Sequence, residues 1–245
     1  MVLVLLCACA SELPNLRSSK EVESATPSAA TQLELAESHL LSSDAGKAAS
    51  LVISILALKP TASELNRARL LLQRCRRQQE PPLAANVESQ LHEALQNLER
   101  GTPIGEQLGV LETLAKTVEH PRAWTVLGLA LLQSGLSQEA IAYLKAAAER
   151  FPVAPHPPRA LGRYFFDREN YAEASLALQK AAKLDPFDVP TWRMLNSVAS
   201  VLNESQLVIE SAKMLALLHR TGTNSPQRSS PSPAFARAGS RGSSK

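Results

Sequence analysis

Hydrophobic residues recur at intervals of three and four along most of the chain, which is the spacing of one face of an α-helix. Leucine and alanine supply most of these positions, and the polar residues between them are largely Glu, Gln, Lys and Arg, which favour helices. No run alternates in the way that a half-buried strand does. The pattern therefore predicts an all-α protein. The predicted helices span residues 31–41, 48–60, 63–79, 84–100, 103–118, 121–133, 137–150, 155–168 and 171–184, followed by one from 188 and one over 204–220.

Capping residues mark several of the predicted helix boundaries. Asp44 is the N-cap candidate of the second helix, and Thr61 or Ser63 is that of the third. Gly101 is expected to end the fourth helix in the left-handed conformation. The dipeptide 102–103, Thr-Pro, is expected to start the next helix as N-cap and first residue.

Residues 121–188 contain one 34-residue pattern twice. A fixed period of this length is typical of stacked helical hairpins. Glycine in the first helix of each copy leaves room for a neighbouring helix, and proline ends the second helix. The matching pairs are Leu127 and Leu161, Gly128 and Gly162, Ala140 and Ala174, Leu144 and Leu178, Ala147 and Ala181, and Pro152 and Pro186.

These residues resemble the tetratricopeptide repeat. The residues that carry the resemblance in the first copy are Trp124, Leu127, Gly128, Leu131, Ala140, Leu144, Ala147 and Pro152. The second copy departs from it at Pro158, where the family has an aromatic residue. The resemblance implies an α-solenoid of antiparallel hairpins: degenerate units over 29–120, repeats over 121–154 and 155–188, and a degenerate third unit with a capping helix over 189–220.

The family's hairpins curve into a groove that holds a peptide, and the resemblance places its lining on the first helix of each repeat. The implied groove residues are Arg122, Thr125, Leu129, Leu132, Gln133, Arg159, Arg163, Phe166, Asp167, Arg193 and Ser197. Arginine binds carboxylates in bidentate fashion, so an acidic segment or a free C-terminus is the expected ligand. The alternative is that the arginines solvate the groove or pair with acids such as Asp167. Trp124 and Trp192 are expected to pack inside the repeats.

The net charge of +3 divides unevenly along the chain. Residues 220–245 carry +5 without an Asp or Glu, which leaves −2 for the remainder and argues against a nucleic-acid partner. This tail is rich in Ser, Pro and Gly and is predicted to be disordered. Residues 67–77 contain five arginines. They suggest either a phosphate- or nucleic-acid-binding face or a solvated helix face, and the second interpretation is the more common one.

The first ten residues are almost entirely apolar and too few to span a bilayer. Residues 6–9, Leu-Cys-Ala-Cys, resemble the lipobox of bacterial lipoproteins, which implies acylation at Cys9 and a membrane anchor. Ala10, a residue other than Asp, implies the outer membrane, and residues 10–28 read as a flexible tether. Because no Lys or Arg precedes the apolar run, the alternatives are a true start upstream of Met1 and an incidental apolar end. Cys7 is a poorer acceptor.

No catalytic constellation is found in the sequence. The five histidines are scattered, no Cys/His cluster has metal-ligand spacing, and Cys75 is predicted to be a packed or half-exposed thiol. Neither a metal nor a cofactor nor a small-molecule substrate is therefore expected. The predicted function is a non-catalytic scaffold that binds a peptide or protein partner and is tethered to the periplasmic side of the bacterial envelope. The alternatives are a cytosolic adaptor or co-chaperone and a repeat subunit of an envelope protease or hydrolase.

Overall fold

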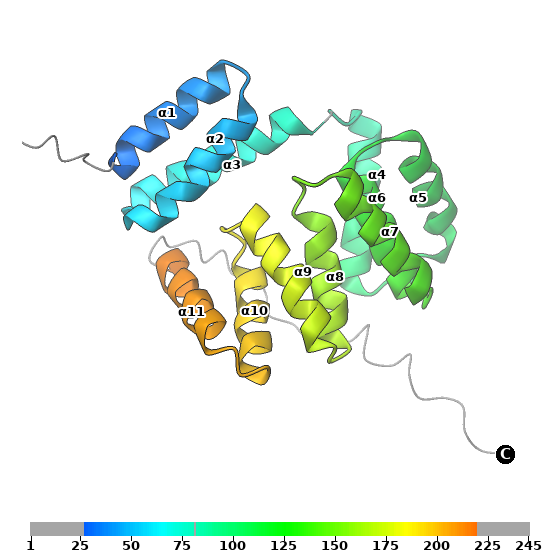
Figure 1. Ribbon diagram of the computed structural model, residues 1–245. Coiled ribbons are helices and arrows are strands. Elements are labelled where there is room, and N and C mark those ends of the chain that lie inside the picture. Colours follow the sequence, from blue (N-terminus) through cyan, green and yellow to red (C-terminus); the bar gives the residue numbers. More distant parts are fainter. Residues whose placement is uncertain (1–26, 81, 220–245) are drawn as a thin grey trace, which may run out of the picture.

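The computed structural model describes residues 27–80 and 82–219, and these residues form eleven α-helices, one 3₁₀ helix and no strand. The prediction of an all-α repeat fold is confirmed. Apart from α3 and α4, successive helices are antiparallel neighbours along an arc (Figure 1). The elements are α1 (Ala29–Leu41), α2 (Ala45–Ser54), η1 (Ile55–Leu58), α3 (Ala62–Gln79), α4 (Ala85–Arg100), α5 (Gly105–Thr117), α6 (Pro121–Gln133), α7 (Ser137–Arg150), α8 (His156–Asp167), α9 (Tyr171–Leu184), α10 (Val189–Val201) and α11 (Ser205–His219).

Helices α1 to α3 form an N-terminal unit, residues 27–80, around a core of their own. The predicted cap Asp44 accepts a hydrogen bond from the backbone N–H of Lys47, and Thr61 forms a capping box with Glu64. The second helix is shorter than predicted: η1 follows α2, and Lys59 takes a left-handed conformation. The reason is Pro60, which disfavours the helical conformation in the residue before it.

Helices α4 and α5 lead into the clear repeats. Gly101 ends α4 with a φ of 71°, as predicted, but α5 begins at Gly105 and not at Pro103. The Thr102 backbone N–H donates to the Asn97 carbonyl oxygen, so Thr102 completes the end of α4. The N-cap position of α5 is Ile104, whose side chain forms no capping hydrogen bond.

The two clear repeats are the hairpins α6–α7 and α8–α9. A Cβ atom added at Gly128 would lie 2.6 Å from Cγ of Leu144, and one added at Gly162 would lie 2.6 Å from Cγ of Leu178. Both leucines are fully buried. The glycines are therefore required by close helix approach, as the sequence predicted.

The third hairpin, α10–α11, packs differently. Asn196 occupies the position of the repeat glycine, and its side-chain amide donates to the Val208 carbonyl oxygen and the Ser211 hydroxyl. Ser211 and Leu218 are buried, whereas Ala212, the counterpart of Leu178 at the 34-residue spacing, is exposed. With an amide in place of the glycine hydrogen, α11 buries Ser211 and Leu218 and not the residue that corresponds to Leu178.

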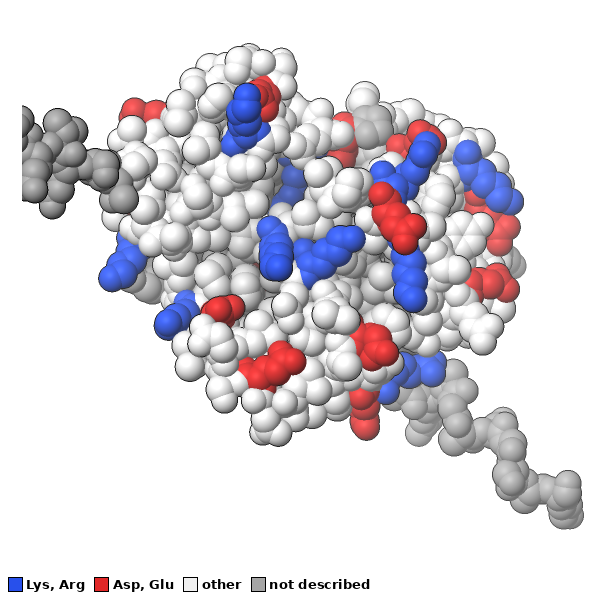
Figure 2. Space-filling view, in the orientation of Figure 1, with Lys and Arg blue, Asp and Glu red and all other residues white. Residues whose placement is uncertain are grey.

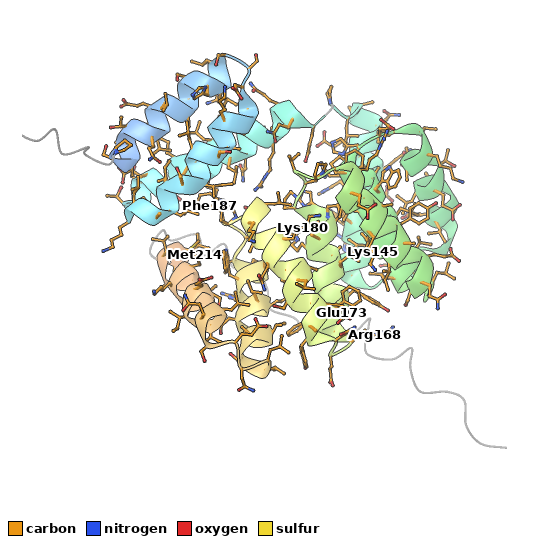
Figure 3. The ribbon with its side chains drawn as sticks, viewed as in Figure 1. Lys145, Arg168, Glu173, Lys180, Phe187 and Met214 are labelled. Atoms are coloured by element: carbon orange, nitrogen blue, oxygen red, sulfur yellow. The ribbon has the colours of Figure 1, made fainter. Side chains whose placement is uncertain are left out.

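Side-chain contacts join the N-terminal unit directly to the second repeat, although helices α4 to α7 lie between them in the sequence. We call this contact region the junction. The guanidinium of Arg76, at the end of α3, contacts the Asp185 carboxylate at 3.0 Å and donates to the Leu184 carbonyl oxygen at 2.7 Å. Phe187 packs against the N-terminal core and lies between that unit and α10 (Figure 3). Beside them, Glu80 lies 3.6 Å from His120. Because of these contacts, the N-terminal unit and the second repeat lie next to each other.

Candidate peptide-binding site

The first helices of the repeats, α6, α8 and α10, lie side by side, with α6 in contact with α8 and α8 in contact with α10. They carry the groove positions that the sequence predicted. The face formed by the second helices, α7, α9 and α11, has cations and carboxylates interspersed (Figure 2).

The groove positions of the first repeat are already in contact with the rest of the chain. Arg122 lies 3.3 Å from Glu88 of α4, and Gln133 donates to the Thr102 carbonyl oxygen. Thr125 is buried, and its hydroxyl donates to the Pro121 carbonyl oxygen within α6. Leu132 is buried and Leu129 half-buried. Contacts with helix α4 and Thr102, together with burial inside α6, therefore occupy most of the predicted groove positions of the first repeat.

The second and third repeats leave two cations exposed. Arg163 lies 3.8 Å from Asp167 one turn along α8, with about half of its side chain exposed (53%). Arg193 on α10 is exposed and forms no ion pair with a described residue. Phe166 is half-buried and meets Tyr171 edge to face, and Ser197 is exposed on α10. The two arginines stand on adjacent helices.

Arg159 is held more firmly. It lies 3.2 Å from Asp188, whose side chain is 15% exposed and also accepts from the backbone N–H of Thr191 at the start of α10. This carboxylate caps a helix and pairs with a guanidinium at once. Arg159 therefore serves the contact between α8 and α10, which is the alternative that the sequence left open for the groove arginines.

Three arginines from three elements gather around His156, and sequence reasoning missed this cluster. Burial and then the guanidiniums of Arg159, Arg76 and Arg122 lower the pKa of His156 to about 4, against an opposing effect of Asp188. The imidazole is therefore neutral at pH 7. Arg76 comes from α3, far outside the 34-residue period, so no repeat signal could have placed it here.

Each arginine of this cluster faces its own carboxylate: Arg76 faces Asp185, Arg122 faces Glu88 and Arg159 faces Asp188. The cluster is thus neutralised within the chain. Next to it, burial raises the pKa of Glu80 and lowers that of His120. These groups form a polar core at the junction and present no free charge for a ligand.

The tryptophans pack inside the repeats, as expected. Trp124 contacts Tyr143 and Phe151 edge to face, and the Trp192 indole N–H donates to the Pro186 carbonyl oxygen. Cys75 is fully buried, and burial raises the pKa of its thiol. The predicted lipidation site, Cys9, lies outside the described residues.

Within residues 27–80 and 82–219, no group of three or more His, Cys, Asp and Glu side chains could hold a metal ion. No described helix combines the length and the apolar character needed to cross a bilayer.

Comparison with known proteins agrees with the repeat pattern. Residues 109–155 match the family model described as Tetratricopeptide repeat. No curated protein matches the chain. Among solved structures, the chain is similar to a MamA RS-1 ArsTM double mutant, at 16% identity over 80% of this chain and 96% of that one, with a TM-score of 0.42. It is also similar to MamA from Desulfovibrio magneticus RS-1, at 16% identity over 80% and 97%, with a TM-score of 0.41.

The matched segment runs from α5 through α6 and α7, and so includes the first of the two 34-residue hairpins with its Gly128–Leu144 contact. The second hairpin repeats that contact at Gly162 and Leu178. The chain therefore contains a tetratricopeptide repeat at residues 109–155, and its second hairpin has the same glycine–leucine contact.

Proposed function

We propose that this chain is a non-catalytic scaffold that binds an acidic segment of a protein partner against α8 and α10. Arg163 and Arg193 supply the charge, and Phe166 supplies an apolar contact. The observation that carries the proposal is the difference in pairing among the groove arginines: Arg122 and Arg159 face carboxylates of neighbouring elements, whereas Arg163 and Arg193 remain accessible.

The contact between Arg163 and Asp167 does not prevent binding. An exposed pair at i, i+4 on a helix contributes about 0.3–0.5 kcal/mol. A charge-assisted hydrogen bond to a ligand carboxylate contributes about 1.5–3 kcal/mol. A partner carboxylate therefore displaces Asp167 at little cost.

We expect Arg163→Glu with Arg193→Glu to weaken binding of a fluorescent hexaglutamate peptide about tenfold to a hundredfold, because two charge-assisted contacts are lost. The measurement is fluorescence anisotropy, with circular dichroism to verify the fold. Lys145→Glu with Lys213→Glu makes the same change of net charge at exposed positions of α7 and α11, and should leave affinity unchanged. If both double variants weakened peptide binding equally, the effect would be one of net charge alone, and the proposed site at Arg163 and Arg193 would be rejected.

We further propose that the chain is anchored to the bacterial envelope through Cys9. The support is the apolar run and the Leu-Cys-Ala-Cys sequence at residues 6–9, followed by a polar segment suited to a tether. Acyl chains at one cysteine contribute about 0.8 kcal/mol for each buried methylene, so two or more give stable anchoring.

Labelled palmitate should be incorporated into the chain in a bacterial host and should be absent from Cys9→Ser, while Cys7→Ser should still be labelled. After a high-salt wash, fractionation should find the Cys9→Ser protein in the soluble fraction and the unaltered chain in the membrane fraction. Absence of label from the unaltered chain would favour a cytosolic adaptor.

A further inference from the structure

The five arginines of α3 separate into two groups. Arg67 binds Glu37 of α1 through two hydrogen bonds, and Arg76 binds Asp185 at the junction. The remaining arginines, Arg69, Arg74 and Arg77, are exposed, and none forms an ion pair with a described residue. Three of the five arginines therefore form no ion pair with a described residue, although Arg74 helps to lower the pKa of Glu37.

The three arginines without an ion pair, Arg69, Arg74 and Arg77, lie on the side of α3 that faces away from the N-terminal core. At 100° per residue, Arg69, Leu70, Gln73 and Arg77 share one face, and Arg74 lies at its border toward Glu37 of α1. The opposite face carries the core residues Leu65, Ala68, Leu71, Leu72 and Cys75. Leu70 is 61% exposed among the arginines.

No carboxylate of α3 neutralises this face. The one acid inside the helix, Glu64, is part of the capping box in the first turn. The face therefore combines three guanidiniums with one exposed leucine, which is the composition of a helix that lies against an anionic membrane surface. Arginine donates several hydrogen bonds to phosphate, and a leucine beside it enters the interface.

The position of the helix in the chain favours a membrane over other polyanions. Residues 10–27 separate the proposed anchor Cys9 from the N-terminal unit. Their composition predicts a flexible tether, and 18 residues of such a tether would have a root-mean-square length of about 20–25 Å. Such a tether keeps the N-terminal unit, which stands at one end of the molecule (Figure 1), within reach of the bilayer.

We propose that the face of α3 formed by Arg69, Leu70, Arg74 and Arg77 docks on the headgroups of anionic phospholipids. It orients the N-terminal unit toward the bilayer and leaves α8 and α10 free for a protein partner. The choice of a membrane as the partner rests on the proposed anchor at Cys9. The contact itself requires neither acylation nor the proposed peptide site, so each of the three can fail separately.

The test uses the full-length Cys9→Ser chain and vesicles of phosphatidylcholine with or without phosphatidylglycerol, separated by sedimentation. We expect binding only with phosphatidylglycerol, and loss of this binding at high salt. Each arginine near an anionic surface is worth about fivefold in affinity, so Arg69→Gln, Arg74→Gln and Arg77→Gln together should reduce partitioning about a hundredfold.

Lys145→Gln, Lys183→Gln and Lys213→Gln are the control, because they remove the same charge from exposed positions elsewhere and keep the basic tail. They should retain binding. Leu70→Ser should also weaken it, which a purely Coulombic contact would not show. The proposal is overturned if control and α3 variants lose binding equally, or if the α3 variant keeps it. It is also overturned if the α3 substitutions weaken binding to oligothymidylate or to an acidic protein but not to vesicles.

Discussion

Replacing Gly162 with alanine should lower the free energy of unfolding by about 2 kcal/mol. The new methyl group would lie 2.6 Å from Cγ of Leu178 and 3.2 Å from its backbone nitrogen, so helix α9 itself would have to shift. Overpacking of a tight core costs about 1–3 kcal/mol. The loss should appear in urea unfolding and as a melting temperature lower by roughly 4–8 °C.

The other glycines provide graded controls. At Gly128 the methyl group meets only side-chain atoms of Leu144, which can rotate, so its replacement should cost less than that of Gly162. Gly109 lies within α5 with no atom within 4 Å of an added Cβ. Alanine there should raise stability by up to about 1 kcal/mol through helix propensity alone. If Gly162→Ala were as stable as Gly109→Ala, close packing of the hairpin would not be what the repeat glycine provides.

Arg76→Ala should release the N-terminal unit from the second repeat. The Arg76 and Asp185 side chains are only 16% and 23% exposed, and the guanidinium also binds the Leu184 carbonyl oxygen at the end of α9. Hydrogen bonds to charged groups contribute about 1.5–3 kcal/mol, and the change leaves Asp185 without its partner. We expect faster amide exchange in α1 to α3, and a larger radius of gyration in solution scattering.

The next residue supplies a matched control, because Arg77 is exposed and has no ion pair with a described residue. Arg77→Ala should leave exchange and scattering unchanged. In a double-mutant cycle, Arg76→Ala with Asp185→Ala should cost less than the sum of the single changes. Strict additivity of the two would show that the pair does not hold the junction.

The parts of the fold that the sequence predicted are those with local causes. Asp44, Thr61 and Gly101 determine helix ends through contacts within four residues, and the hairpins follow from the glycine–leucine contact repeated every 34 residues. Where two local rules competed, the prediction failed. Thr102 could cap the next helix or complete the previous one, and the structure has the second.

The pairing of the groove arginines could not be predicted, because it depends on contacts without a period. Arg76 meets Asp185 across 109 residues of chain, and Arg122 meets Glu88 of a hairpin whose sequence has lost the repeat signature. The family pattern identifies which residues face inward. It does not say which of them already have a carboxylate from another element.

The contact between Arg76 and Asp185 also determines how the molecule carries mechanical load. Tension applied to the N-terminal end of α1 reaches α3 and passes through Arg76 and Phe187 into the second repeat, without stretching the helices from α4 to α7. In a simple solenoid each repeat contacts only its neighbours, so tension passes through every repeat in turn. In this chain the contact between Arg76 and Asp185 braces one section of the arc, between the end that we propose is anchored and the helices that we propose bind a partner.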